Sequence, residues 1–352
     1  MTTVSVPLIT VCIPAYGRAG VLPELLDSVM SQDFDDFDLL ICEDASPARA
    51  AIGAIVGDYQ ARYPGRMHFH ANEENLGYDG NIRNLVARAK GHYCFFMGND
   101  DLMNAGALKT VASALGRYQE LGVILRSYAS FDGTPENINQ TYRYFEREML
   151  FPPGPRTIAT FYRRCVVIPG LVVNRAAALR HATERFDGTL LYQLYLVANI
   201  LVDMNGVSLP EILTLYRNGG IPDFGNSEKE KGKFVPQSQT PESSLHFMRG
   251  MLQIASWVEA DRKVPIYKMI LRDIGNYSYP IISIQAGQSL PVFLGYAYRL
   301  ALLGFWKCGM FYLYFLSIVV LGTKRVDALI RFIKRRLGHT PRIGSFYRGA
   351  AK

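Results

Sequence analysis

The sequence lacks several features of secreted and membrane-spanning proteins. Its 352 residues include five cysteines and no C-x-x-C pair, a pattern that favours buried, reduced thiols in a cytosolic domain. No basic segment followed by an apolar run occurs near residue 1, so we expect no secretory signal. Cys308–Gly322 has no charge but is shorter than the ~20 residues that span a bilayer as a helix. If the segment is extended back to Leu300, it reaches that length but includes Lys307. A re-entrant or spanning helix over Leu300–Gly322 is therefore an alternative.

Motifs of several enzyme classes are absent as well. The chain has no P-loop, H-E-x-x-H or G-x-S-x-G motif, which disfavours several kinase and hydrolase mechanisms. His68 and His70 share one face of a predicted strand, but a third metal ligand is missing. We therefore interpret these two histidines as structural.

Positive charge is concentrated at the C-terminal end. The formal net charge is +7, yet Arg299–Lys352 contains eleven Lys or Arg residues and one acid, Asp327, so the preceding residues carry a net −3. Within this segment, Val326–Leu337 places aliphatic residues on one side of a predicted helix and basic residues on the other: Val326, Leu329, Ile330, Ile333 and Leu337 against Arg325, Arg331, Lys334, Arg335 and Arg336. This pattern predicts a helix at an anionic membrane surface and no nucleic-acid partner. A surface helix packed on its own domain and a partner-protein surface are the alternatives.

Strand-like and helix-like segments alternate over the first 130 residues. The predicted strands are Leu8–Ile13, Phe37–Cys42, Met67–His70, Tyr93–Met97 and Val123–Ser127, and the predicted helices are Val21–Met30, Ala48–Tyr63, Asn81–Ala89 and Ala105–Tyr118. This alternation is typical of an α/β sandwich on a mainly parallel sheet. Gly133–Pro155 is predicted as a loop or a sheet-edge excursion. We expect a catalytic domain over 1–218, a mobile loop or linker over 219–241, and a helical, membrane-associated region with a basic amphipathic tail over 242–352.

Three predicted strands end in polar sequences: Pro14-Ala15-Tyr16-Gly17-Arg18, Glu43-Asp44-Ala45-Ser46-Pro47 and Gly98-Asn99-Asp100-Asp101. The carboxyl ends of parallel strands meet at one edge of a sheet, where ligands bind. Asp100 and Asp101 could hold Mg²⁺ or Mn²⁺, which would act as a Lewis acid on a departing diphosphate. Asp44 could accept the ring N–H of a pyrimidine while Tyr16 flanks the ring. The alternative for the acid pair is a solvated turn that caps the next helix.

These motifs, with Asn75-Leu76-Gly77, Asn81, Asn84 and Gly91-His92-Tyr93, resemble glycosyltransferase family 2 in order and spacing over about 130 residues. The resemblance implies a GT-A fold, a nucleotide-diphospho-sugar donor and a Mn²⁺ or Mg²⁺ cofactor. By position it places Pro14, Tyr16 and Asp44 at the nucleoside, Asp100 at the metal with Asp101 beside it, and Asp79 and Asn81 near the ribose and donor sugar. Arg18, Glu43 and Asn99 complete the predicted donor-binding set.

Two positions depart from the family pattern. The family's D-x-D-D reads Gly98-Asn99-Asp100-Asp101 here, so either metal binding is weaker or Asn99 supplies a neutral oxygen ligand. The acidic pair that usually supplies the base in inversion is also missing. Asp187 is the one acid in that stretch after Glu184, and we name it as the catalytic candidate, with a helix N-cap as the alternative. The stereochemical outcome stays open.

The resemblance and the basic tail together predict a hexosyltransferase acting on a lipid-linked or cell-surface glycan, as in bacterial O-antigen or capsule synthesis. Its predicted location is the cytoplasmic face of the plasma membrane, as a peripheral or monotopic protein. One alternative is a nucleotidyltransferase, which would need a Gly-rich basic loop where Pro14–Gly20 offers Arg18 alone. A catalytically inactive membrane scaffold is the other. Arg163 and Arg164 could contact a phosphate of the acceptor or form a solvated surface pair. Arg217 could contact the diphosphate of the donor or have a structural role.

Overall fold

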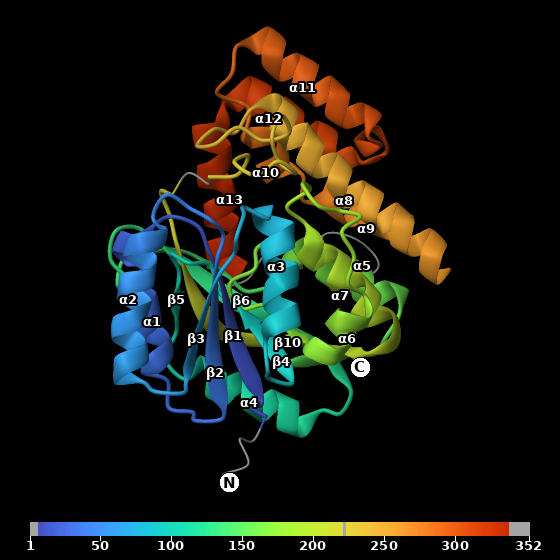
Figure 1. Cartoon of the computed structure of the whole chain (residues 1–352). Coiled ribbons are helices and arrows are strands. Elements are labelled where there is room, and N and C mark those ends of the chain that lie inside the picture. Colours follow the sequence, from blue (N-terminus) through green and yellow to red (C-terminus); the bar gives the residue numbers. More distant parts are fainter. Residues whose placement is uncertain (1–5, 221–222, 338–352) are drawn as a thin grey trace.

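A single mixed sheet organises the protein in the computed structural model, which describes residues 6–220 and 223–337 (Figure 1). The strand order is β3-β2-β1-β4-β9-β6-β10-β5, with β7 beside β6 and β8 beside β10. The strands are β1 Ile9–Ala15, β2 Phe37–Glu43, β3 Met67–Ala71, β4 Tyr93–Phe96, β5 Leu102–Met103, β6 Leu121–Phe131, β7 Ile138–Tyr142, β8 Met149–Phe151, β9 Val172–Asn174 and β10 Asn205–Arg217.

The first four strands in the sequence, β1 to β4, pair with one another in parallel. The short strand β9 then lies antiparallel between β4 and β6, while β6 and β10 pair in parallel. The expectation of a mainly parallel sheet is therefore wrong for the second half, where β5, β7, β8 and β9 all pair antiparallel. The segment Gly133–Pro155 supplies the sheet-edge strands β7 and β8.

Helices cover both faces of the sheet and build two hydrophobic cores. Their bounds are α1 Leu22–Met30, α2 Arg49–Arg62, α3 Gly77–Arg88, α4 Ala107–Arg117, α5 Pro155–Tyr162, α6 Arg175–Arg180 and α7 Tyr192–Asp203. Side chains alternate along β1, so Ile9, Val11 and Ile13 pack against α1, α2 and α4, while Cys12 faces the opposite core with α3, α5 and α7. All five cysteines are free and buried, as the sequence predicts.

The C-terminal helices pack against the second of these cores. They are α8 Pro241–Arg262, α9 Tyr267–Asn276, α10 Tyr279–Ser283, α11 Leu290–Leu302, α12 Gly309–Leu321 and α13 Thr323–Leu337, and they lie at one end of the molecule in Figure 1. Their buried residues, such as Ile254, Ile274 and Val326, belong to the same hydrophobic cluster as Cys12. The boundaries we predict at residues 218 and 242 fall just after β10 and at the start of α8.

The apolar segment after Leu300 is not one continuous helix. Helix α11 ends at Leu302, Gly304 has a positive φ of 111°, a 3₁₀ turn covers Phe305–Lys307, and α12 begins at Gly309. No helix within the described ranges is both long and apolar enough to cross a membrane.

Candidate donor-binding and metal site

The polar ends of three strands lie together at one edge of the sheet. Strand β1 pairs with both β2 and β4, and Ala15 is in register with Glu43. The Asn99 side-chain amide donates to the carbonyls of Tyr16 and Gly17, at 3.3 and 3.2 Å. These contacts place the segments that follow β1, β2 and β4 side by side, as the strand pattern predicts.

Asp100 presents its carboxylate at this edge, where it forms an ion pair with Arg18. Its side chain is 15% exposed. The backbone carbonyl of Asp100 accepts a hydrogen bond from Arg217 Nε at 2.9 Å, and Arg217 Nη2 also pairs with Glu24 at 2.8 Å. Arg217 therefore has a structural role here, joining the end of β10 to α1 and to the acid pair.

Asp101 is buried beside Asp100. Its Oδ1 accepts a hydrogen bond from the backbone N–H of Arg217 at 3.0 Å. Burial raises the pKa of Asp101 to about 7, while the Arg217 N–H and the positive charges of Arg18, Arg217 and Arg126 act in the opposite direction. The side chain that meets solvent at the sheet edge is thus Asp100.

The donor set around Asp100 is compatible with a hard divalent cation. Within the part of the chain that the structure describes, no three His, Cys, Asp or Glu side chains converge on one point. Mg²⁺ is commonly held by one or two carboxylates, with substrate phosphates and waters completing its coordination. A partly buried carboxylate next to a fully buried one fits that mode of binding, with Arg18 as the group that holds Asp100 in the free protein.

Asp44 lies at the end of β2, almost fully buried. Its Oδ1 accepts hydrogen bonds from Asn72 Nδ2 at 2.7 Å and from the backbone N–H of Leu76 at 2.9 Å. Burial raises its pKa to about 6, and these two hydrogen bonds lower it. Tyr16 directly follows Ala15, whose carbonyl accepts a hydrogen bond from the Asp44 N–H at 3.0 Å. Burial raises the pKa of the Tyr16 hydroxyl, and the charges of Asp223 and Asp44 raise it further. Pro14 lies on β1, two residues before Tyr16, and is in register with Cys42 on β2.

Glu43 and Asn81 use their polar groups within the protein. Glu43 is fully buried and accepts hydrogen bonds from Ser46 N at 2.7 Å and Arg49 Nε at 2.5 Å. Asn81 donates to the Cys42 carbonyl at 3.0 Å and accepts from Asn72 Nδ2 at 3.1 Å. Both residues fix the end of β2, so they support the position of Asp44 in the free protein. A direct donor contact for either stays a prediction.

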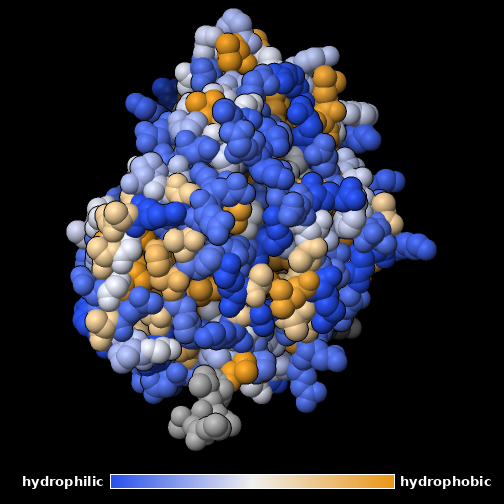
Figure 2. All heavy atoms as spheres, viewed as in Figure 1, coloured by the Kyte–Doolittle hydropathy of each residue, from blue (hydrophilic) through white to orange (hydrophobic). Residues whose placement is uncertain are grey.

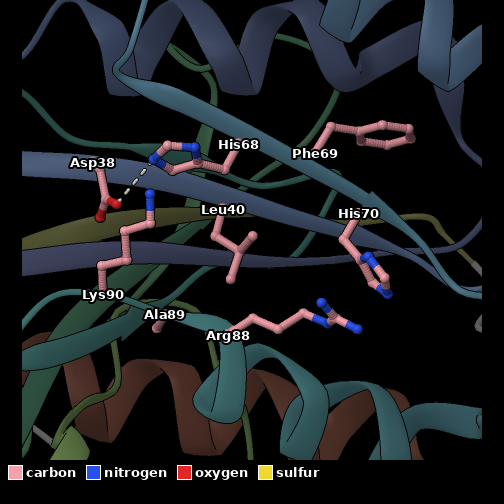
Figure 3. Close-up of a pocket in the computed structure, with 8 residues that line it drawn as sticks. All are labelled: Asp38, Leu40, His68, Phe69, His70, Arg88, Ala89 and Lys90. Atoms are coloured by element: carbon pink, nitrogen blue, oxygen red, sulfur yellow. Dashed lines mark ion pairs between the residues drawn. The ribbon is translucent and has the colours of Figure 1, made fainter.

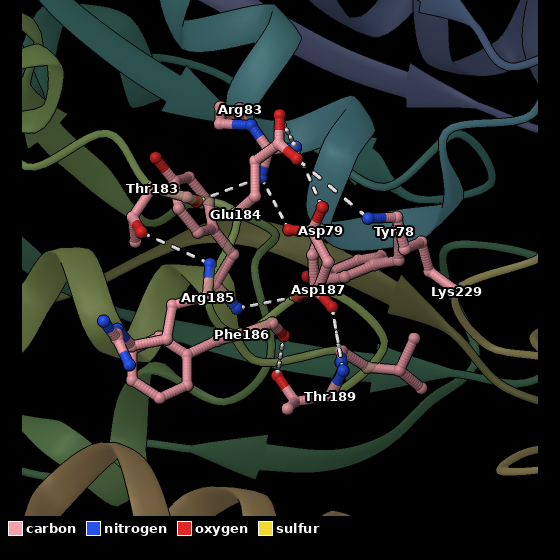
Figure 4. A network of polar contacts seen from close by, with 12 residues as sticks. Tyr78, Asp79, Arg83, Thr183, Glu184, Arg185, Phe186, Asp187, Thr189 and Lys229 are labelled. Atoms are coloured by element: carbon pink, nitrogen blue, oxygen red, sulfur yellow. Dashed lines mark hydrogen bonds and ion pairs between the residues drawn. The ribbon is translucent and has the colours of Figure 1, made fainter. Parts of the chain in front are cut away.

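Asp79 organises the start of α7, as Figure 4 shows. It is buried on α3, and its carboxylate accepts hydrogen bonds from the backbone N–H groups of Thr189, Leu190 and Tyr192 at 3.0, 2.9 and 2.8 Å. Burial raises the pKa of Asp79 to about 7, and the Tyr192 and Leu190 N–H groups lower it. The sequence gives no sign of this contact, because the acid and the helix it caps are more than 100 residues apart.

Asp187 is engaged by Arg83 in the same network (Figure 4). Arg83 Nη1 and Nη2 donate to the two Asp187 oxygens at 2.6 and 2.9 Å. The acid that caps α7 is Asp79, so the alternative role of Asp187 as a helix N-cap is wrong. Its role as a base stays a prediction.

Replacement of Asp79 by Ala should destabilise the fold. Three buried N–H groups would lose their acceptor, so we expect the free energy of unfolding to fall by about 3 kcal/mol. Urea denaturation followed by circular dichroism measures this loss. The control is Glu74→Ala, at an exposed position three residues before α3 begins. An equal loss of stability in both variants would contradict the capping role.

The loop between β10 and α8 contributes residues that the sequence does not reveal. Glu230 is buried, and its two oxygens accept hydrogen bonds from Tyr78 N at 2.7 Å and Gly225 N at 2.8 Å. Gly77 has a φ of +74°, and a Cβ there would lie 2.5 Å from Ser227 Oγ. This loop, which we expected to be a linker, therefore packs on the start of α3 beside the Asn75-Leu76-Gly77 motif.

Two residues at this edge, Arg18 and Ala45, have a left-handed backbone conformation. Six non-glycine residues have a positive φ in the described chain, and Arg18, Ala45 and Leu190 are among them. Each adjoins a contact described above: the ion pair of Asp100, the end of β2 and the N–H groups capped by Asp79. Residues in such conformations cluster at functional sites, which supports this edge as the active site.

A hollow of about 200 Å³ lies over β2 and β3, away from the sheet edge described above (Figure 3). His68 Nε2 is 3.3 Å from Asp38, and burial together with Arg88 lowers the pKa of His70. In Figure 3 the His70 ring points away from the His68–Asp38 pair. This arrangement agrees with the structural interpretation of the two histidines.

Comparison with known proteins identifies the family of this domain. Residues 10–181 match the model of glycosyl transferase family 2. The matched range begins at the second residue of β1 and contains Tyr16, Asp44 and Asp100. The chain therefore carries a glycosyl transferase family 2 domain, built on the α/β GT-A fold.

Two curated relatives resemble this chain over part of their length. The chain is 31% identical over 181 residues to abequosyltransferase RfbV of Salmonella typhimurium, covering 51% of this chain and 54% of that protein. It is 27% identical over 105 residues to the GalNAc(5)-diNAcBac-PP-undecaprenol beta-1,3-glucosyltransferase of Campylobacter jejuni, covering 30% and 33%. The matched segments thus span about half and a third of the lengths of these relatives.

Solved structures share the fold over most of the chain. S. aureus TarS 1–349 superposes with a TM-score of 0.58 at 15% identity, covering 83% of this chain and 79% of that chain. The mannosyltransferase PcManGT of Pyrobaculum calidifontis, solved with GDP-Man and Mn²⁺, superposes with a TM-score of 0.51 at 15% identity, covering 91% and 88%. At this level of identity the likeness concerns the fold alone.

Proposed function

We propose that this protein transfers a sugar from a nucleotide-diphospho-sugar to a hydroxyl of a lipid-linked or cell-surface glycan. The observation that carries the proposal is the convergence of Tyr16, Asp44 and Asp100 at the carboxyl edge of a family 2 domain. The activities named for RfbV, a sugar transferase, and for the Campylobacter glucosyltransferase, an enzyme of a PP-undecaprenol-linked glycan, support this class of reaction and acceptor.

The residues at this edge divide into a nucleoside end and a diphosphate end. Pro14, Tyr16 and Asp44 would bind the base and ribose, and Asp100 with Asp101 would hold Mn²⁺ or Mg²⁺. The cation would neutralise the charge that develops on the departing diphosphate. Arg18 pairs with Asp100 in the free protein, so donor binding would release its guanidinium towards the phosphates. Asn99 holds the Tyr16–Gly17 backbone beside them.

Asp187 remains the candidate base in this proposal. Arg83 donates one hydrogen bond to each of its oxygens, which leaves a second lone pair on each oxygen that can accept a proton. Asp187 also lies next to the loop that Asp79 fixes. We therefore propose that Arg83 sets the position of Asp187 in the donor complex.

The C-terminal helices suit attachment to the surface of a membrane. Sixteen of the twenty-two exposed large hydrophobic residues in the described chain lie within residues 290–337, and some are visible where α11 and α12 lie at the top of Figure 2. Large exposed apolar surfaces mark interaction sites. Together with the basic residues of α13, they support peripheral binding to an anionic membrane, at the cytoplasmic face where nucleotide sugars are available.

Donor profiling tests the proposed function. The purified protein is incubated with a panel of sugar nucleotides and Mn²⁺, and nucleotide release is followed. We expect one donor to release its nucleoside phosphate. Release of inorganic diphosphate from a nucleoside triphosphate and a sugar phosphate would indicate the nucleotidyltransferase alternative. A folded protein that neither binds nor turns over any donor would indicate the inactive scaffold.

Asp44→Asn should weaken donor binding while leaving the fold intact. The amide keeps an oxygen for Leu76 N and Asn72 but loses the charged acceptor for the base N–H, so we expect a 10- to 100-fold higher donor Kd, on the order expected for a hydrogen bond to a charged group. In the wild type, affinity should also fall as the pH drops below about 6, because Asp44 then becomes protonated. Isothermal titration calorimetry over pH 5–8 measures both effects.

The Asp44→Asn variant should lack this pH dependence. Asp58→Asn, on the exposed face of α2, is the matched control and should bind the donor like the wild type. An unchanged donor Kd in Asp44→Asn would remove Asp44 from the site.

A further inference from the structure

A large cavity lies between the sheet domain and the C-terminal helices. Its volume is about 900 Å³, within the range of small-molecule sites, which are roughly 300–1,000 Å³. Most of its wall is apolar, with Met248 and Met251 from α8, Ile274 from α9, and Val326 and Ile330 from α13. No described residue in its wall is acidic.

Three cationic side chains enter this apolar wall. Arg163, Arg164 and Lys334 line the cavity. Asp273, the acid paired with the two arginines, accepts from Arg163 Nε at 3.0 Å and from Arg164 Nη1 at 3.4 Å. Their side chains are only 19% and 4% exposed, so the alternative of a solvated surface pair is wrong.

Positive charge in the cavity exceeds negative charge. Arg163 Nη2 is buried and has no hydrogen-bond partner. Lys334 Nζ lies 5.6 Å from the centre of the Tyr142 ring, and burial and the nearby Arg163 lower its pKa. Asp327, which lies next to the wall residue Tyr279, accepts a hydrogen bond from the Tyr279 hydroxyl at 2.5 Å. Arg163 Nη2 is thus a buried donor without an acceptor, and Arg163 and Lys334 are neighbouring cations. An anionic ligand would satisfy both of these features.

The cavity borders the donor site on one side. Tyr216 on β10 precedes Arg217, whose N–H donates to Asp101 at 3.0 Å. Tyr216 is in register with Ser130 on β6, two residues beyond the wall residue Tyr128, whose ring stacks on that of Tyr142. Phe224, another wall residue, packs edge-on against Tyr78, with ring centres 5.6 Å apart. A ligand anchored in the cavity can therefore extend towards the edge where the donor would bind.

On its other side the cavity reaches the exposed apolar surface of the C-terminal helices. Leu313 on α12 and Leu329 and Ile333 on α13 line the cavity and are also exposed. An apolar chain can thus pass from a membrane surface into the cavity without crossing a polar layer.

We propose that this cavity binds the lipid end of the acceptor, an isoprenoid chain with a phosphate or diphosphate head. The chain lies along the apolar wall of α8, α12 and α13, and the phosphate pairs with Arg163 Nη2 and Lys334 Nζ. This inference rests on the proposed function and adds the place where the acceptor is held.

Direct binding to the full chain tests the proposal without any donor or metal. Geranylgeranyl diphosphate, below its critical micelle concentration and with EDTA present, is titrated while protein fluorescence is followed. Geranylgeraniol and inorganic diphosphate are the comparison ligands. We expect the lipid diphosphate to bind at least ~10-fold more tightly than either, because only this ligand satisfies both the apolar wall and the cations.

Two charge variants and one filling variant locate the site. Lys334→Gln and Arg163→Gln should each raise the Kd about 10-fold, and Ser317→Trp, which adds volume to the wall, should weaken binding at unchanged charge. The matched controls are Lys324→Gln, exposed on α13, and Arg156→Gln, exposed on α5. Thermal unfolding monitors Arg163→Gln, since this residue also pairs with Asp273; Lys334→Gln and Ser317→Trp leave that pair intact.

Three results would overturn the proposal. Equal affinity for geranylgeraniol would mean that the cations take no part, equal affinity for inorganic diphosphate would mean that the apolar wall takes none, and unchanged affinity in both Lys334→Gln and Ser317→Trp would place the lipid elsewhere. Nucleotide release in donor profiling is measured in parallel. A wild type that releases nucleotide but does not bind the lipid refutes this inference alone, whereas lipid binding without donor turnover refutes the proposed function.

Discussion

Asp100→Asn should lower the rate of sugar transfer by about 1,000-fold. The proposed cation stabilises the departing diphosphate by several kcal/mol, and about 4 kcal/mol corresponds to a factor of about 1,000 in rate. Asn keeps the size of the side chain but removes the negative charge that a divalent cation requires. Excess EDTA should inhibit the wild type to a similar extent, and added Mn²⁺ should restore it. The measurement is nucleotide release with the donor that profiling identifies.

The control for this substitution is Asp58→Asn, which changes an exposed carboxylate on α2 and should leave the rate unchanged. Stability of Asp100→Asn should stay close to that of the wild type, because the ion pair with Arg18 is partly exposed and such pairs contribute little. Full activity in excess EDTA would show that no cation takes part. Arg18 and Arg217 would then be the groups to test as stabilisers of the leaving diphosphate.

The central part of the fold was predictable from local sequence. The strand β1 is a run of β-branched and small apolar residues, which is typical of a strand buried on both faces, and Pro14-Ala15-Tyr16 marks its end. Strands β2 (FDLLICE) and β4 (YCFF) are likewise short, mostly apolar runs that are followed by polar residues. Because the carboxyl ends of parallel strands lie at the same edge of a sheet, the sequence alone predicts that Tyr16, Asp44 and Asp100 lie together.

Contacts between distant segments could not be predicted in this way. The sheet was expected to be mainly parallel because strands and helices alternate over the first 130 residues. The three-residue strand β9 lies antiparallel between β4 and β6, and no local sequence pattern shows that direction. Asp79 caps a helix that begins at Tyr192, and Glu230 binds the N–H of Tyr78. In both cases the acid is unremarkable in its own segment, and only the packing of two elements brings it to its partner.

The helix α13 shows the same limit on a smaller scale. Its amphipathic pattern is visible in the sequence, and α13 begins at Thr323 and ends at Leu337. The pattern groups Lys334 with the other basic residues, yet Lys334 lines the cavity together with Val326, Leu329, Ile330 and Ile333. Four of the five residues of the predicted apolar face therefore contribute to an internal wall, and the exposed apolar surface is shared with α11 and α12.

Charge reversal on the outer side of α13 should release the protein from anionic membranes. Arg325, Arg331, Arg335 and Arg336 are exposed, and each basic residue near an anionic surface contributes about 1 kcal/mol. Replacing all four by Glu removes this attraction and adds repulsion, so we expect binding to phosphatidylglycerol liposomes to weaken at least ~100-fold near 0.1 M salt, where the screening length is about 10 Å. Co-sedimentation with the liposomes measures the bound fraction. Lys334 is left unchanged because it belongs to the cavity.

The matched control reverses four exposed basic residues on the sheet domain: Arg62, Lys90, Lys109 and Arg156. This variant has the same net charge as the first and should stay bound, which separates a local effect of α13 from a general effect of charge. Nucleotide release from the donor should survive in both variants, because neither changes the edge of the sheet. If the α13 variant remains bound through high-salt and carbonate washes, the exposed apolar side chains of α11 and α12, such as Tyr298, Leu302 and Val320, hold the protein on the membrane. The basic face of α13 would then have no part in the attachment.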